Sequence, residues 1–64
     1  MKIHFQGKTT RIHEEAPVPI SQVLDSLGLN PVEVIVSKGG RVVPEDASLG
    51  PDDELRIVRV SHGG

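Results

Sequence analysis

The chain is short and contains no cysteine, and these two features together most constrain how it can fold. Its 64 residues allow one domain at most, and a domain of this size buries only about 60% of the surface that its unfolded chain exposes. No disulfide and no cysteine-ligated zinc can stabilise it. We therefore predict one compact domain whose stability comes from a single apolar core, built mostly from Val, Ile and Leu.

The charges are nearly balanced and are interspersed along the sequence. Seven basic and nine acidic residues give a formal net charge of −2, and there is one Phe but no Tyr or Trp. Direct nucleic-acid binding needs a basic surface, and single-strand binders add aromatic side chains on which bases stack, so this class is disfavoured. No apolar run reaches membrane-spanning length and no signal pattern opens the chain. We expect a cytoplasmic protein with no membrane contact.

The first part of the sequence predicts a β-hairpin. Residues 1–6 alternate apolar and polar side chains, with the odd-numbered positions on the buried side. A turn at Gly7-Lys8 leads into a second strand over Thr9–His13, in which Thr10 and Ile12 are expected to point inward.

Residues 20–27 predict one amphipathic helix, because apolar side chains recur at offsets of three, four and seven. The members of this face are Ile20, Val23, Leu24 and Leu27. Pro19 fits the first helical turn, and Gly28 fits a left-handed cap after the last turn. The preceding segment, Glu14–Pro19, is expected to be an irregular connector, because its two prolines disfavour a strand.

Three further strands are predicted after the helix. They cover Val32–Ser37, Arg41–Val43 and Glu54–Val60, and a loop over Pro44–Pro51 contains one helical turn at Glu45–Ala47. The order β-β-α-β-β-β predicts an α+β domain with a mixed sheet and one main helix packed across one face. This order fits the β-grasp arrangement, in which the first and last strands are parallel neighbours. It also fits a ferredoxin-like half or a small barrel.

Three features occur together in this sequence. They are the helix ISQVLDSLGLNP at Ile20–Pro31, the stretch VEVIVSKGGRVVPEDASLGPDDELRIVRV at Val32–Val60, and the final pair Gly63-Gly64. Together they resemble the ThiS/MoaD family of ubiquitin-like sulfur carriers and the archaeal small modifier proteins of that superfamily. The MoaD pattern tends to have a proline and a phenylalanine shortly before the glycines, where this chain has Val60-Ser61-His62, so the resemblance favours the ThiS and archaeal modifier branches.

The resemblance implies a ubiquitin-like β-grasp domain over residues 1–60 and a flexible tail over residues 61–64. It also implies that an E1-like enzyme adenylates the carboxylate of Gly64 with ATP, and that a sulfur donor converts it to a thiocarboxylate. The sulfur would pass to a sulfurtransferase or pathway enzyme in thiamine, molybdopterin or tRNA thiolation. Such a chain is a co-substrate rather than an enzyme, and no cofactor is expected.

Two alternatives stay open at this point. The chain could be a protein modifier that is conjugated through Gly64 to lysines of target proteins. It could also be a non-covalent β-grasp interaction module, whose glycines would then be dispensable.

Elementary chemistry explains why glycines would serve at such a terminus. A free carboxylate is a poor electrophile, and adenylation opens its carbonyl carbon to attack by a sulfur nucleophile. The nucleophile must come within about 3–3.5 Å of that carbon, and glycine has no Cβ to obstruct it. From Val60 to Gly64 an extended chain spans roughly 14 Å at ~3.5 Å per residue. We expect Gly64 to be the reacting residue and Gly63 to be recognised in the tail.

An exposed apolar patch is predicted on the sheet face opposite the helix. Leu55 and Ile57 are expected to face the helix, so their neighbours in the strand face away from it. The predicted patch consists of Ile35, Val58 and Val60, edged by Arg56 and Arg59. A contiguous exposed apolar patch marks an interaction site, so we predict that a partner docks here.

Other titratable groups are expected to be ordinary surface residues. His4 and His13 could face each other across the hairpin, but His62 lies on the tail, so no metal site is predicted. The acidic pairs Glu14-Glu15 and Asp52-Asp53 lie in loops and are not expected to perform acid–base chemistry.

Overall fold

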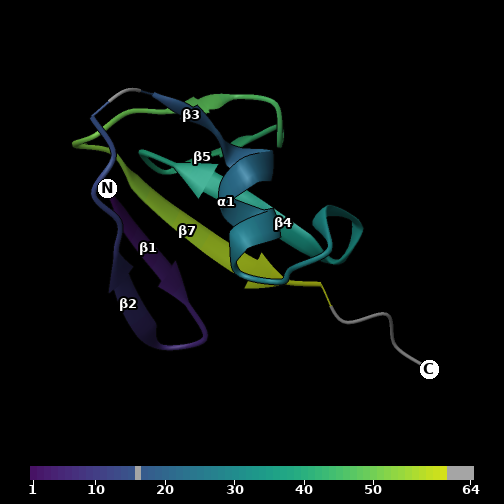
Figure 1. Cartoon of the computed structure of the whole chain (residues 1–64). Helices are drawn as coiled ribbons and strands as arrows, with labels where there is room; N and C mark the ends of the chain where they lie inside the picture. Colours follow the sequence, from purple (N-terminus) through teal and green to yellow (C-terminus); the bar gives the residue numbers. More distant parts are fainter. Residues whose placement is uncertain (16, 61–64) are drawn as a thin grey trace.

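The computed structural model describes residues 1–15 and 17–60. It consists of a five-stranded mixed sheet, one α-helix packed across one face of that sheet, and a small two-stranded sheet (Figure 1). The strands of the main sheet are β1 (Lys2–Phe5), β2 (Lys8–Arg11), β4 (Val34–Lys38), β5 (Arg41–Val43) and β7 (Glu54–Arg59). The other elements are β3 (Val18–Pro19), helix α1 (Ile20–Ser26), the 3₁₀ helix η1 (Pro31–Glu33) and β6 (Ser48–Leu49).

The strand order of the main sheet is β2-β1-β7-β4-β5. β1 and β7 are parallel neighbours at its centre, with Ile3 opposite Leu55 and Phe5 opposite Ile57, and the other neighbours are antiparallel. This is the β-grasp arrangement. The predicted α+β class, the mixed sheet with one main helix and the parallel pairing of the first and last long strands are therefore confirmed. A ferredoxin-like half and a small barrel do not fit this strand order.

Two-residue turns with left-handed backbone close both hairpins. Gln6 and Gly7 have φ values of 51° and 76°, and Gly39 and Gly40 have φ values of 59° and 80°. Turns of this hand match the right-handed twist of the strands that they join. The first turn comes one residue earlier than the predicted Gly7-Lys8, because Lys8 already pairs with Phe5.

Helix α1 agrees with the prediction to within one residue. Gly28 has a φ of 72°, its N–H donates to the Asp25 C=O at 3.0 Å, and the Leu29 N–H donates to the Leu24 C=O at 2.9 Å. These bonds form a Schellman motif, and its left-handed residue is the predicted cap, Gly28. The inward placement of Leu27 is wrong: the helix ends before it, and 38% of its surface is exposed.

The start of the helix is held by the segment that follows β5. The Ile20 N–H donates to the Ala47 C=O at 2.9 Å, and the Ser21 N–H donates to the Glu45 C=O at 2.8 Å. The first N–H groups of a helix have no partner within it, so these carbonyls satisfy them. β3 also pairs with β6, in segments predicted as a connector and a loop. Around the predicted helical turn, a single turn forms in which the Ala47 N–H donates to the Pro44 C=O at 3.0 Å, and it does not continue as a helix. These long-range pairings leave no local pattern in the sequence.

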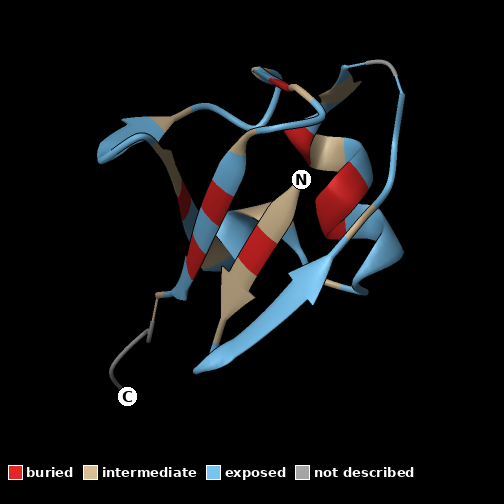
Figure 2. Cartoon of the chain, turned by 90° about the vertical axis from the view of Figure 1, so that its left-hand side faces the viewer, coloured by how far each residue is buried: buried red, intermediate tan, exposed pale blue. Residues whose placement is uncertain are grey.

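The core lies between α1 and the sheet face that it covers, as the distribution of buried residues shows (Figure 2). Its buried members are Ile3, Ile20, Val23, Leu24, Val36, Leu49, Leu55 and Ile57. Leu49 is buried although its segment was predicted as a loop, whereas Thr10, predicted to point inward, is exposed with the rest of β2. Among the described residues, no helix is long and apolar enough to cross a membrane.

Candidate functional site

Helix α1 covers one face of the main sheet, and we call the opposite face the helix-free face. The centre of the predicted patch lies on this face. Along β7, Leu55 and Ile57 are buried in the core, whereas Arg56 and Val58 are exposed. Val58 lies opposite Ile35 of β4, and the exposed fractions of these two residues are 53% and 46%. Side chains directly opposite each other on neighbouring strands contact one another. Ile35 and Val58 therefore form one apolar cross-strand pair.

Val60 marks the point where the chain leaves the sheet. It follows the end of β7, is half-buried, and by strand alternation falls on the same side as Val58. Its N–H donates a hydrogen bond of 2.8 Å to the C=O of Glu33. This bond fixes the last described residue against the segment that leads into β4.

Arg59 lies elsewhere than predicted. It pairs with Val34, whose side chain packs against the core, so the alternation of β7 places Arg59 on the helix-covered face. Its guanidinium carbon is 5.8 Å from the centre of the Phe5 ring, a cation–π contact. At an exposed site such a contact stabilises by about 0.5–1 kcal/mol. Arg59 therefore does not edge the Ile35–Val58 pair, whereas Arg56 shares their face.

A row of polar side chains crosses the helix-free face beside this pair. Arg56 lies opposite Ser37 on one side and opposite His4 on the other, and His4 lies opposite Thr9 rather than the predicted His13. The His4 ring bonds to Glu54 through Nε2 at 2.7 Å and to the Thr9 hydroxyl through Nδ1 at 3.0 Å. The hydrogen bond from His4 is the main reason why the pKa of the Glu54 carboxyl is lowered.

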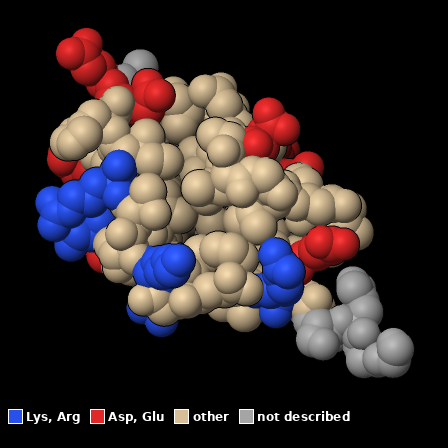
Figure 3. Space-filling model, turned by 60° about the horizontal axis from the view of Figure 1, so that its bottom comes forward, with Lys and Arg blue, Asp and Glu red and all other residues tan. Residues whose placement is uncertain are grey.

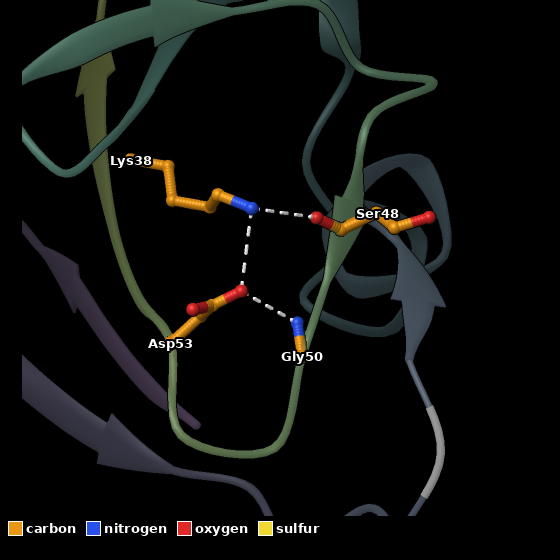
Figure 4. A network of polar contacts seen from close by, with 4 residues as sticks. All are labelled: Lys38, Ser48, Gly50 and Asp53. Atoms are coloured by element: carbon orange, nitrogen blue, oxygen red, sulfur yellow. Dashed lines mark hydrogen bonds and ion pairs between the residues drawn. The ribbon is translucent and has the colours of Figure 1, made fainter.

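A second polar network holds the turn that leads into β7 (Figure 4). Asp53 Oδ2 accepts a hydrogen bond of 2.7 Å from the Gly50 N–H and lies 3.3 Å from Lys38 Nζ. Lys38 also donates to the Ser48 C=O at 3.2 Å. The bond from Gly50 lowers the pKa of the Asp53 carboxyl most, and Lys38 lowers it further. The sequence predicted a turn over residues 50–53, but the partner Lys38 could not be identified from it.

The predicted reacting residues lie outside the described part of the chain. Gly63 and Gly64 belong to residues 61–64, so their predicted roles stay predictions. Within residues 1–15 and 17–60, no group of three or more His, Asp or Glu side chains is placed to hold a metal ion.

The charged side chains are unevenly distributed over the surface. On the face seen in Figure 3, Lys and Arg lie mainly at the left and along the lower margin, and Asp and Glu lie mostly along the upper and right margins.

Comparison with known proteins bears on the fold more than on the chemistry. No family model matches this sequence. An uncharacterized protein of Archaeoglobus fulgidus is 43% identical over 44 residues, which make up 69% of this chain and 64% of that protein. The matched part thus spans less than two thirds of that relative.

The fold also resembles solved structures, and one of them matches over its whole length. The crystal structure of the thiamine biosynthesis protein ThiS from Geobacter metallireducens superimposes with a TM-score of 0.69, covering 100% of both chains at 20% sequence identity. At this identity the likeness shows the fold alone. This chain and that ThiS structure thus share the β-grasp fold.

The Asp53 network predicts a pH-dependent stability. The folded state lowers the pKa of Asp53 below its unfolded value of about 3.9, so the ionised carboxylate stabilises the fold above that pH. This contribution is lost as the pH falls through the lowered pKa. We predict that Asp53→Asn reduces the free energy of unfolding at pH 7, and that its difference from the unmodified chain shrinks below about pH 4.

Urea denaturation at neutral and acidic pH measures both effects. Asp52→Asn is the matched control, since within the described residues the Asp52 side chain takes no part in this network. A difference between Asp53→Asn and the unmodified chain that stays constant down to pH 2 would exclude the ionised carboxylate as its source.

Proposed function

We propose that this protein is a ubiquitin-like sulfur carrier whose reacting group is the carboxylate of Gly64. The observation that carries the proposal is the placement of Gly63-Gly64 shortly after β7, in a chain whose β-grasp fold matches ThiS over its full length. An E1-like adenylating enzyme is the first partner, and a pathway enzyme that accepts the sulfur is the second. The chain supplies the acyl group and no catalytic side chain.

The proposed chemistry proceeds in two steps, an adenylyl transfer followed by an acyl transfer. The Gly64 carboxylate attacks the α-phosphorus of ATP, pyrophosphate leaves, and an acyl-adenylate forms. A sulfide nucleophile then attacks the acyl carbon, the bond to AMP breaks, and the thiocarboxylate remains. Neither step changes the oxidation state of carbon, so no redox cofactor is required.

The geometry at the end of β7 supports this role. The Val60 N–H donates a hydrogen bond of 2.8 Å to the Glu33 C=O, and this bond holds the chain immediately before residues 61–64. Four extended residues span roughly 14 Å at ~3.5 Å each, which is enough to reach into a partner's active site while the folded body docks outside. The glycines at the end leave the acyl carbon open to attack from either side.

We propose that the partner docks on the helix-free face. The docking patch consists of Ile35, Val58 and Val60 with Arg56 beside them. The apolar pair would anchor the partner, and Arg56 would meet a carboxylate, since interface anchors combine buried apolar side chains with Arg. The Arg59 side chain is left out, because it lies on the opposite face against Phe5.

Mass measurement of the intact protein tests the sulfur-carrier proposal. We expect that incubation with an E1-like adenylating enzyme, ATP and sulfide replaces one oxygen of the terminal carboxylate by sulfur. The gain in mass should map to the C-terminal peptide and require ATP. A chain lacking Gly63 and Gly64 is the control and should gain nothing.

Two results would contradict the proposal. One is the absence of sulfur in the full chain although the enzyme converts another carrier in the same mixture. The other is a chain that is adenylated without gaining sulfur and is found joined to lysines as a Gly-Gly remnant, which would assign it to the modifiers.

A charge on the docking patch should slow adenylation. We expect Val58→Asp to lower kcat/KM for adenylation by at least about tenfold, because it places a carboxylate in the apolar contact. Gln22→Asp adds the same charge on the exposed side of α1 and should leave kcat/KM within about twofold, as an ordinary surface change does. Equal rates for both variants, with both folded by circular dichroism, would place the docking surface elsewhere.

A further inference from the structure

Strand β2 lies at one end of the main sheet and has a neighbour on one side only. In the part of the chain that the structure describes, β2 pairs with β1, and no strand lies on its other side (Figure 1). All four of its residues, Lys8–Arg11, are exposed. The outer edge of β2 is therefore open to a further strand.

The ladder between β1 and β2 shows which backbone groups face this open edge. The Lys2 N–H donates to the Asp53 C=O at 3.0 Å, on the side away from β2. Hydrogen-bonded and non-hydrogen-bonded pairs alternate along an antiparallel ladder, so Arg11, opposite Lys2, and Thr9, two residues earlier, are in non-hydrogen-bonded pairs. Their N–H and C=O groups point outward. Outside the ladders, no backbone hydrogen bond found within residues 1–15 and 17–60 uses these groups.

Basic side chains lie on both faces of this edge strand. Lys8 lies opposite Phe5, which packs against the core, so Lys8 is on the helix-covered face. Strand alternation then places Arg11 on the helix-free face. Residues 1–13 contain no Asp or Glu, so neither strand of the hairpin supplies a carboxylate to these two side chains.

One row of charged side chains across the sheet ends at this edge. Glu54 of β7 lies opposite Lys2 of β1, and Arg11 of β2 lies opposite Lys2 on the other side. Two positive side chains are thus neighbours, and like charges directly opposite each other destabilise a strand pair. Arg11 has the open edge on its far side. A carboxylate on an added strand would lie opposite Arg11 and offset this repulsion.

We propose that the outer edge of β2 binds an extended acidic segment of a partner protein as an added strand. The segment pairs its backbone with the outward N–H and C=O groups of Thr9 and Arg11. Because Lys8 and Arg11 lie three residues apart on opposite faces, the segment carries two acidic residues three positions apart, whichever way it runs. Main-chain hydrogen bonds supply the affinity, and the side chains supply the specificity.

Other occupants fit this edge less well. A second copy of the chain would bring another β2, whose charged side chains are all basic, and like charges repel. A nucleic acid carries negative charge but has no row of peptide groups to pair with the outward N–H and C=O groups. The inference does not depend on the sulfur-carrier proposal, because β1 separates β2 from β7 and no residue of β2 belongs to the docking patch.

A peptide titration followed by NMR tests the proposal. The probe is acetyl-Val-Glu-Thr-Val-Glu-Val-amide, added to the ¹⁵N-labelled full chain. We expect shift changes centred on Lys8–Arg11 and slower solvent exchange of the Thr9 and Arg11 N–H groups. The exchange of the Thr10 N–H should change less, because it already bonds to β1.

A second peptide tests the spacing of the acidic residues. Acetyl-Val-Glu-Val-Glu-Thr-Val-amide has the same composition but places both glutamates on one face of the added strand. It should bind about two- to fivefold more weakly than the probe, because it loses one exposed charge pair. Equal binding of the two peptides would overturn the proposed recognition.

Two protein variants locate the binding edge. Arg11→Gln should weaken binding of the probe about two- to fivefold. Arg41→Gln removes the same charge from β5, at the other end of the sheet, and should leave binding nearly unchanged. Equal effects of the two variants would overturn the proposal, and so would shift changes without slower exchange at Thr9 and Arg11.

Three further results would also contradict the proposal. One is the absence of shift changes up to millimolar peptide. Another is tighter binding of a thymidine hexanucleotide than of the probe at the same residues, which would assign the edge to a nucleic acid. The third is a set of shift changes at β2 that follows protein concentration without peptide, which would assign the edge to a second copy.

Discussion

Parallel pairing of β1 with β7 is the interaction on which the rest of the structure depends. It brings Ile3 against Leu55 and Phe5 against Ile57, residues that are far apart in the sequence, and these side chains form the floor on which α1 packs. Closing so long a loop costs conformational entropy. Because the chain has no cysteines and so no disulfide, the free energy gained by burying apolar side chains must compensate for this cost. β2 and β4 then add to the outer sides of this pair.

The same pairing gives the two faces of the sheet different roles. One helix of seven residues covers one face, so the side chains that alternate with the core residues of β7 stay exposed. Leu55 and Ile57 stabilise the fold, whereas Arg56 and Val58 are available to a partner. The bond from the Val60 N–H to the Glu33 C=O extends the contact between this strand and the segment before β4 to the last described residue.

Local patterns in the sequence predicted most of this fold. The alternation of β7, the helical spacing of Ile20, Val23 and Leu24, and the glycine cap at Gly28 each follow from a period or a backbone preference. The sequence could not predict features made by contacts between distant segments, such as the burial of Leu49 or the bond from His4 to Glu54. Arg59 was predicted at the edge of the patch, but the alternation of β7 places it on the helix-covered face, opposite Val34. The roles of Gly63 and Gly64 rest on the sequence and on the resemblance to sulfur carriers.

Native-state hydrogen exchange tests most directly the claim that β7 is held rigid up to the point where the chain leaves the sheet. We predict that the amides of Leu55 and Ile57 exchange only through global unfolding, with the free energy of unfolding that denaturant titration measures. We also predict that the Val60 amide, which donates to the Glu33 C=O, is clearly protected from exchange. Exchange of Ile57 and Val60 at the rate of an unstructured peptide, in a protein whose β4 amides stay protected, would contradict it.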